Sequence, residues 1–232
     1  MRLVKQTTEF PVINFDEVTG SGMKRQLRKH GPLFPDSVRN ITCGPSNSGK
    51  TNILLNLICD PQGLEYEHIY VFSKSLAQDK YKTLAELMKG QKVGYHTYSD
   101  NAEVPHPNDI HRNSLMIFDD VSCEKQGHMR NYFAMGRHNC VDTLYLCQTY
   151  STVPKQLVRD NANFIILFKQ DEMNMRHVFT DHVTPDMTFE KFKELCGKAW
   201  SASDHGFLVI CKDFGLDKGR YRVGFDTFVQ LS

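Results

Sequence analysis

The sequence predicts an α/β fold with a mostly parallel sheet flanked by helices. A glycine-rich octapeptide at residues 44–51 lies between a short apolar segment and a helix-like segment. A second apolar segment, at residues 115–118, is followed by two consecutive aspartates. Near the end of the chain, a polar turn that contains glycine joins two β-rich segments, which predicts a C-terminal β-hairpin.

The octapeptide reads Gly-Pro-Ser-Asn-Ser-Gly-Lys-Thr and fits the phosphate-binding pattern G-x-x-x-x-G-K-[ST] at every fixed position. Residues 38–43 predict the strand that leads into this loop, and residues 52–58 predict the buried helix that follows it. This is the context that the pattern requires, and it predicts the fold of a P-loop NTPase. The predicted nucleotide-binding residues are Gly44, Pro45, Ser46, Asn47, Ser48, Gly49, Lys50 and Thr51.

The chemistry of this loop depends on backbone amides and one lysine. Gly44 and Gly49 allow the backbone to turn tightly, so that successive N–H groups converge on phosphate. The N-terminus of the following helix directs unpaired amides and its positive dipole end at the same anion. Lys50 is expected to reach the β- and γ-phosphates, and the hydroxyl of Thr51 to bind Mg²⁺. The loop therefore predicts binding of a nucleoside triphosphate with Mg²⁺.

Two acids follow residues 114–118, where four consecutive apolar residues after Ser114 predict a fully buried strand. Asp119, at the end of this strand, is expected to hold Mg²⁺ directly or through water. Asp120 is expected to orient and polarise the water that attacks the γ-phosphate. A second acid, with a further strand between the two motifs, is typical of the additional-strand ATPases, which include ring-forming motors and helicases.

The remaining segments complete the predicted sheet. Residues 142–147 predict a strand that leads to Gln148, whose side chain is expected to sense the γ-phosphate or to position water. The carboxyl ends of the parallel strands should bring Gly49, Asp119 and Gln148 to one edge of the sheet. The other predicted elements are strands at residues 67–73, 93–97, 164–168, 207–211 and 221–225, and helices at residues 76–88 and 189–196.

The length of 232 residues favours one sizeable domain. Residues 1–35, which contain three prolines, are expected to form an N-terminal arm, and residues 36–232 a single ATPase domain. No segment approaches the roughly 20 apolar residues of a membrane span, and the first residues lack the pattern of a secretory signal. The seven cysteines are dispersed without a C-x-x-C pair, which favours a reducing compartment over a disulfide framework.

The net charge of +1 does not by itself indicate nucleic-acid binding. Two basic clusters, at residues 24–30 and 218–222, fit contact with a phosphate backbone. A solvated surface or a contact between subunits explains each cluster at least as well.

With these motifs the chain resembles the FtsK–HerA superfamily of DNA-pumping ATPases. Within that superfamily it is similar to the poxvirus-type genome-packaging ATPases of large DNA viruses, virophages, adenovirus-like elements and Maverick/Polinton transposons. The similarity runs from about Val38 to Phe225. It depends on the loop at residues 44–51, on Ile117–Asp120, on Gly136-Arg137-His138 before the strand that leads to Gln148, and on residues 154–168. Family members usually have glutamate at the position of Asp120, and aspartate has a shorter reach.

The resemblance implies a homo-oligomeric ring of about five or six subunits that threads double-stranded DNA into a preformed capsid. It implies ATP and Mg²⁺ as ligands, capsid vertex or portal proteins as further partners, and no membrane. Lys50 and Thr51 carry over as the phosphate and metal residues, Asp119 as the metal acid, Asp120 as the catalytic acid and Gln148 as the sensor. The expected locations are assembly sites in the host cytoplasm or nucleus, or the virion, and not the secretory pathway.

The family mechanism also requires an arginine finger, which reaches into the neighbouring subunit's site and stabilises charge in the transition state. Arg137, which precedes the strand leading to Gln148, is the first candidate, and Arg159 is the alternative. An ordinary surface or ion-pairing role explains either arginine equally well.

Two other functions stay open. A nucleoside or nucleotide kinase would need an arginine-rich lid, and residues 212–222 can be interpreted as one. A nucleotide-gated assembly or signalling module would bind nucleotide tightly and turn it over slowly. The paired acids disfavour this last class, because it has no need for a water-activating carboxylate.

Overall fold

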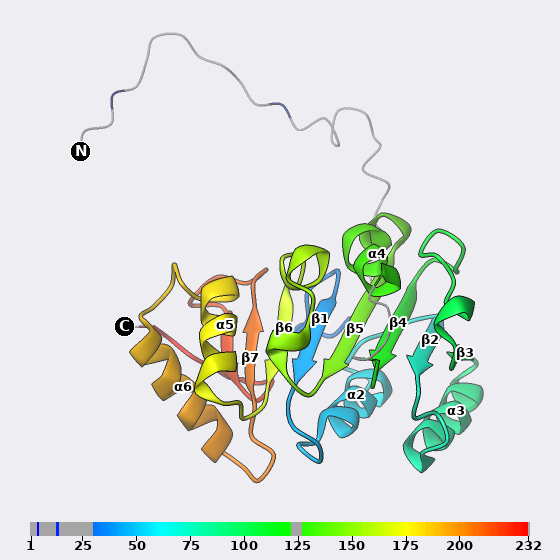
Figure 1. Ribbon diagram of the computed structural model, residues 1–232, viewed down its shortest axis with the longest axis horizontal. Coiled ribbons are helices and arrows are strands. Elements are labelled where there is room, and N and C mark those ends of the chain that lie inside the picture. Colours follow the sequence, from blue (N-terminus) through cyan, green and yellow to red (C-terminus); the bar gives the residue numbers. More distant parts are fainter. Residues whose placement is uncertain (1–3, 5–12, 14–29, 122–126, 232) are drawn as a thin grey trace.

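The computed structural model describes Val4, Ile13, residues 30–121 and residues 127–231. In this part of the chain, a sheet of nine strands has the order β3-β2-β4-β5-β1-β6-β7-β8-β9, with helices on both faces (Figure 1). The strands are β1 (Arg39–Cys43), β2 (His68–Ser73), β3 (Gly94–Tyr98), β4 (Ser114–Asp119), β5 (Val141–Cys147), β6 (Phe164–Leu167), β7 (Leu208–Cys211), β8 (Tyr221–Val223) and β9 (Thr227–Phe228). The helices are α2 (Lys50–Cys59), α3 (Asp79–Gln91), α4 (Gly127–Met135), α5 (Glu172–His182) and α6 (Phe189–Ser201), with short turns η1 (Asn101–Glu103), η2 (Gly136–Asn139), η3 (Tyr150–Thr152) and η4 (Lys155–Arg159).

The first six strands in the sheet order, which are β3, β2, β4, β5, β1 and β6, run parallel to one another. β5 lies between β1 and β4, with Cys147 opposite Cys43 and Leu146 opposite Asp119. β7 and β8 continue the sheet beside β6 as an antiparallel hairpin, which the short strand β9 extends. This topology confirms the predicted α/β fold, with a strand inserted between the two motif strands and a hairpin at the C-terminal end.

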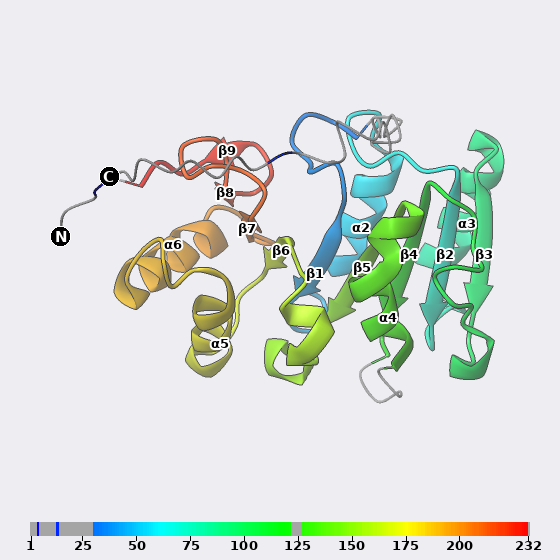
Figure 2. The same cartoon turned by 90° about the horizontal axis from the view of Figure 1, so that it is seen from above.

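Each face of the sheet has its own hydrophobic core. The view from above shows α2 and α3 on one face and α4, α5 and α6 on the other (Figure 2). Leu54 of α2 and Leu84 of α3 pack with Ile117 of β4 in the first core. Tyr132 of α4 packs with Phe118, the next residue of β4, in the second core. Both faces of β4 are therefore buried, which explains why residues 115–118 are continuously apolar.

Most predicted elements are present with small shifts at their ends. The helix predicted at residues 76–88 spans Asp79–Gln91, and the one predicted at residues 189–196 continues to Ser201. α4, α5 and β9 are not among the predicted elements. α5 begins after Asp171, whose carboxylate accepts a hydrogen bond from the Asn174 amide, an N-cap of the usual kind. No helix in the described ranges combines the length and the apolar character that a membrane span needs.

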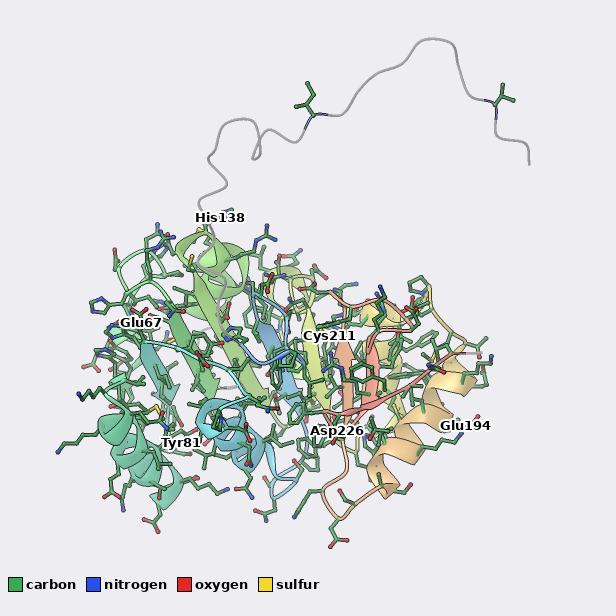
Figure 3. The ribbon with its side chains drawn as sticks, turned by 180° about the vertical axis from the view of Figure 1, so that it is seen from behind. Glu67, Tyr81, His138, Glu194, Cys211 and Asp226 are labelled. Carbon is green, nitrogen blue, oxygen red and sulfur yellow. The ribbon has the colours of Figure 1, made fainter. Side chains whose placement is uncertain are left out.

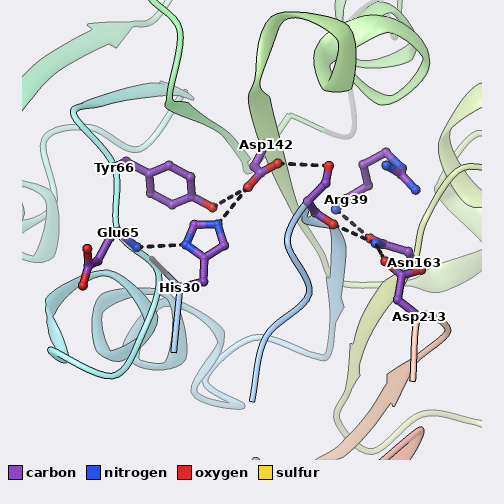
Figure 4. A network of polar contacts seen from close by, with 8 residues as sticks. His30, Arg39, Glu65, Tyr66, Asp142, Asn163 and Asp213 are labelled. Atoms are coloured by element: carbon purple, nitrogen blue, oxygen red, sulfur yellow. Dashed lines mark hydrogen bonds and ion pairs between the residues drawn. The ribbon is translucent and has the colours of Figure 1, made fainter. Parts of the chain in front are cut away.

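The described chain packs onto the sheet from His30 onward (Figure 4). Asp142, at the start of β5, is fully buried and accepts hydrogen bonds from the hydroxyls of Ser37 at 3.3 Å and Tyr66 at 3.0 Å. His30 Nε2 lies 3.2 Å from the same carboxylate. The Glu65 amide donates to His30 Nδ1 at 3.1 Å, so the ring proton is on Nε2 and faces Asp142.

These contacts place residues 30–35 in the packed domain, although they belong to the arm predicted for residues 1–35. The rest of that arm, apart from Val4 and Ile13, lies outside the described residues. The basic cluster at residues 24–30 lies outside them too, except for His30.

A buried arginine of β8, Arg222, also binds the segment at residues 30–35, through a hydrogen bond to Leu33. Arg222 of β8 is fully buried, and its guanidinium lies 4.9 Å from the ring centroid of Phe214 and 5.0 Å from that of Phe228. Its Nη1 donates to the Leu33 carbonyl at 2.6 Å, and its Nε to the Gly219 carbonyl at 2.7 Å. Arg222 is therefore unable to make the phosphate contact suggested for the cluster at residues 218–222.

Candidate nucleotide-binding site

The phosphate-binding loop joins β1 to α2 at the carboxyl edge of the parallel strands (Figure 1, lower edge). The Gly44 amide donates to the Cys147 carbonyl at 3.1 Å, which ties the loop to β5. A Cβ atom on Gly44 would lie 2.6 Å from Ser48 Oγ and 2.7 Å from Phe168 Cβ, too close for any side chain. Gly49 has φ 102°, a left-handed conformation that favours glycine. The structure therefore requires both glycines of the motif.

The start of α2 provides the anion-binding groups. Gly49 is the N-cap of α2 and offers no side chain to its first turn, whose amides have no acceptor within the helix. Lys50 Nζ donates to the carbonyls of Gly44 at 2.6 Å and Pro45 at 2.8 Å, so its ammonium group lies against the loop. Burial lowers the pKa of Lys50, while the negative charge of Asp119 opposes this shift. Lys50 and Asp119 are thus electrostatically coupled.

Asp119 ends β4 at the same edge, next to the strand that leads to Gln148. The hydroxyl of Tyr81, in the first turn of α3, donates a hydrogen bond to Asp119 Oδ2. Burial raises the pKa of Asp119, and both the Tyr81 hydrogen bond and the positive charge of Lys50 oppose that rise. Tyr81 therefore orients the carboxylate and favours its charged form.

Asp120 follows directly but has different surroundings. Its φ of 57° is left-handed, which turns the backbone sharply after β4 and leaves the side chain exposed. Ser75 Oγ, just after β2, donates to Asp120 Oδ2 at 2.6 Å. The Ser75 amide in turn donates to Ser73 Oγ at 3.0 Å. One carboxylate of the pair is thus partly buried, and the other is held in place at the surface.

Gln148 is exposed directly beyond β5 and borders a hollow of about 400 Å³ beside the phosphate loop. Pro45 of the loop lines this hollow, as does Lys169, which follows β6. The backbone carbonyl of Gln148 accepts a hydrogen bond from Gln170 Nε2 at 3.3 Å. The structure therefore brings the predicted sensor to the phosphate loop, together with a lysine that the sequence prediction does not include.

Arg137 lies at the other end of β5. It belongs to η2, immediately before the strand, and Figure 3 shows its neighbour His138 at the opposite edge of the sheet from Tyr81. Arg137 is exposed and has no ion-pair partner within the described residues. It lines a hollow of about 300 Å³ with Arg39 and Asp213. The structure does not bring Arg137 to the phosphate loop of its own chain.

Arg159, the alternative, is engaged within its own chain. It is only 9% exposed, and its Nη1 donates to Asp181 Oδ2 at 2.8 Å. Its guanidinium also lies 5.2 Å from the ring centroid of Tyr150. These contacts assign Arg159 a structural ion pair that fastens η4 to α5.

The groups at the carboxyl edge fit a nucleoside triphosphate with Mg²⁺. The amides of α2 and the ammonium group of Lys50 suit phosphate oxygens. The Thr51 hydroxyl and the Asp119 carboxylate are oxygen ligands of the kind that Mg²⁺ prefers, with substrate phosphates and water completing its shell. Gly44 and Gly49 leave the backbone of the loop bare, as close approach to phosphate requires.

Three residues of this edge are missing from the sequence prediction: Ser75, Tyr81 and Lys169. Ser75 and Lys169 carried a usable signal, because polar residues that follow parallel strands gather at the ligand-binding edge. Tyr81 carried none, since its contact with Asp119 depends on how α3 packs against the sheet.

Comparison with solved structures supports the fold. The genome packaging NTPase B204 from Sulfolobus turreted icosahedral virus 2, in complex with sulfate, aligns with a TM-score of 0.53 at 15% identity, covering 76% of this chain and 92% of that chain. Its complex with ATP-gammaS gives 0.51 at 14% identity, covering 78% and 94%. B204, the DNA-packaging ATPase from Sulfolobus Turreted Icosahedral Virus, gives 0.53 at 14% identity, covering 77% and 94%. At these identities the likeness shows a shared fold.

The sequence itself matches a family. No curated protein sequence matches the chain. A family model described as "Poxvirus A32 protein" matches residues 29–185, which is more than half of the 232 residues. The matched region contains the phosphate loop, Asp119, Asp120 and Gln148. The match confirms the resemblance drawn from the motifs, and the chain belongs to the Poxvirus A32 protein family.

Proposed function

We propose that this chain is the ATPase subunit of a motor that moves double-stranded viral or virus-like DNA into a capsid. One observation carries the proposal: the phosphate loop, the Asp119–Asp120 pair and Gln148 meet at one sheet edge in a chain of the Poxvirus A32 family. B204, which shares this fold, is a genome packaging NTPase that binds AMP and ATP-gammaS.

In the proposed reaction the loop amides and Lys50 hold the β- and γ-phosphates. A magnesium ion held by Thr51 and Asp119 would neutralise charge on those phosphates. Asp120, positioned by Ser75, accepts a proton from the attacking water, while Gln148 orients that water. Tyr81 keeps the Asp119 carboxylate in one orientation.

The kinase alternative loses its main support. Its lid would be residues 212–222, but β7 runs antiparallel to β6, so that Cys211 pairs with Phe164 at the start of β6. The segment after Cys211 therefore lies at the amino edge of the parallel strands, away from the phosphate loop. Of its two arginines, Arg222 is buried within the domain, and Arg220 forms an ion pair with Asp186 at 2.6 Å. Residues 212–222 are unable to close over the nucleotide of their own chain.

Within this proposal Arg137 is the arginine finger of a homo-oligomeric ring with about five or six subunits. In a head-to-tail ring, one edge of each subunit meets a different edge of its neighbour. An exposed arginine at the amino edge, without an ion-pair partner in the described part of the chain, suits such a contact. Arg159 is disfavoured because Asp181 already neutralises it.

The partners follow from the same proposal. The motor binds double-stranded DNA through backbone phosphates without reading its sequence. A capsid vertex or portal protein receives the ring, and no membrane is involved. The motor works at virion assembly sites in the host cytoplasm or nucleus, or as part of the virion.

The test is phosphate release from ATP by the purified protein, with and without long double-stranded DNA. We expect DNA to stimulate hydrolysis, and we expect Lys50→Ala and Asp120→Asn each to abolish the stimulated rate. Asp120→Asn should still bind ATP, because in this proposal the carboxylate that the substitution removes acts on water and not on the phosphates. Turnover that ignores DNA and instead requires an added nucleoside would replace this proposal with the kinase.

A further inference from the structure

The loop between α6 and β7, residues 202–207, lies against the phosphate loop. A Cβ atom placed on Gly49 would lie 3.6 Å from Cβ, 3.7 Å from Cγ and 3.8 Å from Nδ1 of His205. The His205 side chain is exposed. An accessible imidazole therefore lies directly beside the N-cap of α2, and no role described above uses it.

Two aromatic residues fix this loop on either side of His205. Trp200 Nε1, near the end of α6, donates to the carbonyl of the last residue of β6 at 2.9 Å. Phe207 packs on Phe168 with ring centroids 5.6 Å apart. Phe168 Cβ would in turn lie 2.7 Å from a Cβ atom placed on Gly44 of the phosphate loop. The position of His205 beside the loop is thus set by packing at both ends.

The strand order determines which part of a nucleotide lies near His205. Asp119 and Gln148 follow β4 and β5, on one side of β1, whereas His205 precedes β7, on the other side beyond β6. The γ-phosphate must lie toward the acids and Gln148, because hydrolysis occurs there. The nucleoside then extends from the phosphate loop in the opposite direction, toward β6 and β7.

We infer that His205 contacts the nucleoside of bound ATP and forms one wall of its ribose and base site. The inference rests on the proposed function, since it needs a nucleoside triphosphate in the loop. A planar imidazole suits this position, because it offers a ring face for stacking and a ring nitrogen for a hydrogen bond. The phosphates lie beyond it, on the amides of α2.

The test compares a ligand that has a nucleoside with one that does not. Binding of ATP and of inorganic tripolyphosphate is measured by calorimetry for the wild type, His205→Ala and His177→Ala. His177, an exposed histidine of α5, is the matched control. We expect His205→Ala to weaken ATP binding by roughly tenfold, the effect of losing about one stacking contact, and to leave tripolyphosphate binding unchanged. His177→Ala should bind both ligands like the wild type.

Two results would overturn the inference: unchanged ATP binding in His205→Ala, or an equal loss for ATP and tripolyphosphate, which would assign His205 to the phosphates. The Lys50→Ala variant distinguishes a failure of the inference about His205 from a failure of the proposed function. It should lose affinity for both ligands, and wild-type binding by Lys50→Ala would refute the nucleotide site itself. Because His205 is exposed, its alanine variant without ligand should melt at the wild-type temperature.

Discussion

The two edges of the parallel sheet both carry polar side chains, but they use them differently. β5 shows the contrast within one strand. At its amino end Asp142 is completely enclosed and has Ser37, Tyr66 and His30 as partners. At its carboxyl end Gln148 is exposed to a hollow beside the phosphate loop.

Neighbouring residues repeat the contrast. At the amino edge Asn163 accepts from the Arg39 amide at 2.8 Å and donates to the Ser37 carbonyl at 2.7 Å and to Asp213 at 2.6 Å (Figure 4). At the carboxyl edge Lys50 donates, among the described residues, to loop carbonyls that phosphate can replace. Polar groups saturated by their own chain stabilise the fold, whereas incompletely partnered ones are available to a ligand.

The largest expected effect would contradict this difference between the two edges, because a catalytic role for Arg137 would place part of the catalytic machinery at the amino edge. Arg137→Ala should lower the rate of ATP hydrolysis by about 10³-fold or more if Arg137 stabilises transition-state charge in the neighbouring subunit. Mixing Arg137→Ala with Lys50→Ala subunits should restore activity, because some interfaces then combine an intact finger with an intact loop. Arg130→Ala, an exposed arginine of α4, is the control and should hydrolyse ATP without DNA like the wild type. Absence of complementation in the mixture would exclude Arg137.

The next effect concerns stability and sharpens the comparison within β5. Asp142→Ala should cost about 3–5 kcal/mol in free energy of unfolding, because it leaves buried donors without an acceptor. Gln148→Ala should change the same quantity by about 0.5 kcal/mol or less, as for most exposed residues. Urea unfolding followed by circular dichroism measures both variants. Equal stability losses would contradict the different uses of the two ends of β5.

The smallest effect is a pH shift at the carboxyl edge. Tyr81 donates to the Asp119 carboxylate and so lowers the pKa that burial raises. Tyr81→Phe removes this donor, so the pKa of Asp119 should rise further. In the proposed reaction Asp119 holds the metal in its ionised form, so the acidic limb of the pH–rate profile should move to higher pH in Tyr81→Phe.

Tyr95→Phe provides the control for that shift. The hydroxyl of Tyr95 is buried and has no hydrogen-bond partner in the described ranges of the chain. Its removal should leave the acidic limb in place. A shift of equal size in both variants would mean that Tyr81 acts through packing and not through its hydrogen bond.

The sequence predicted the carboxyl edge better than the amino edge, for a physical reason. The phosphate loop needs fixed residue types at fixed spacing, so Gly44, Gly49 and Lys50 are recognisable without a structure. Asp119 was predictable because it ends an apolar strand, and parallel strands end together. The strand order, β3-β2-β4-β5-β1-β6-β7-β8-β9, comes from the structure and was not part of the sequence prediction.

Asp142 and Gln148 had the same appearance in the sequence, each a polar residue at one end of an apolar strand. Their different uses depend on His30 and Tyr66, which are distant in the sequence and meet Asp142 only in the folded chain. The ion pair of Arg159 with Asp181 is hidden in the same way. The partners of Asp142 and Arg159 thus depend on long-range packing, which the local sequence pattern does not reveal.

The contact between Arg222 and Leu33 has a consequence for synthesis. The two residues are 189 positions apart, and Leu33 leaves the ribosomal exit tunnel long before Arg222 is synthesised. β1 and the phosphate loop are therefore complete in the nascent chain while the segment that precedes them still lacks its final hydrogen bond. A chain arrested before β8 would contain every predicted catalytic residue without the guanidinium that fastens Leu33. Completion of this domain therefore waits until β8 has been translated.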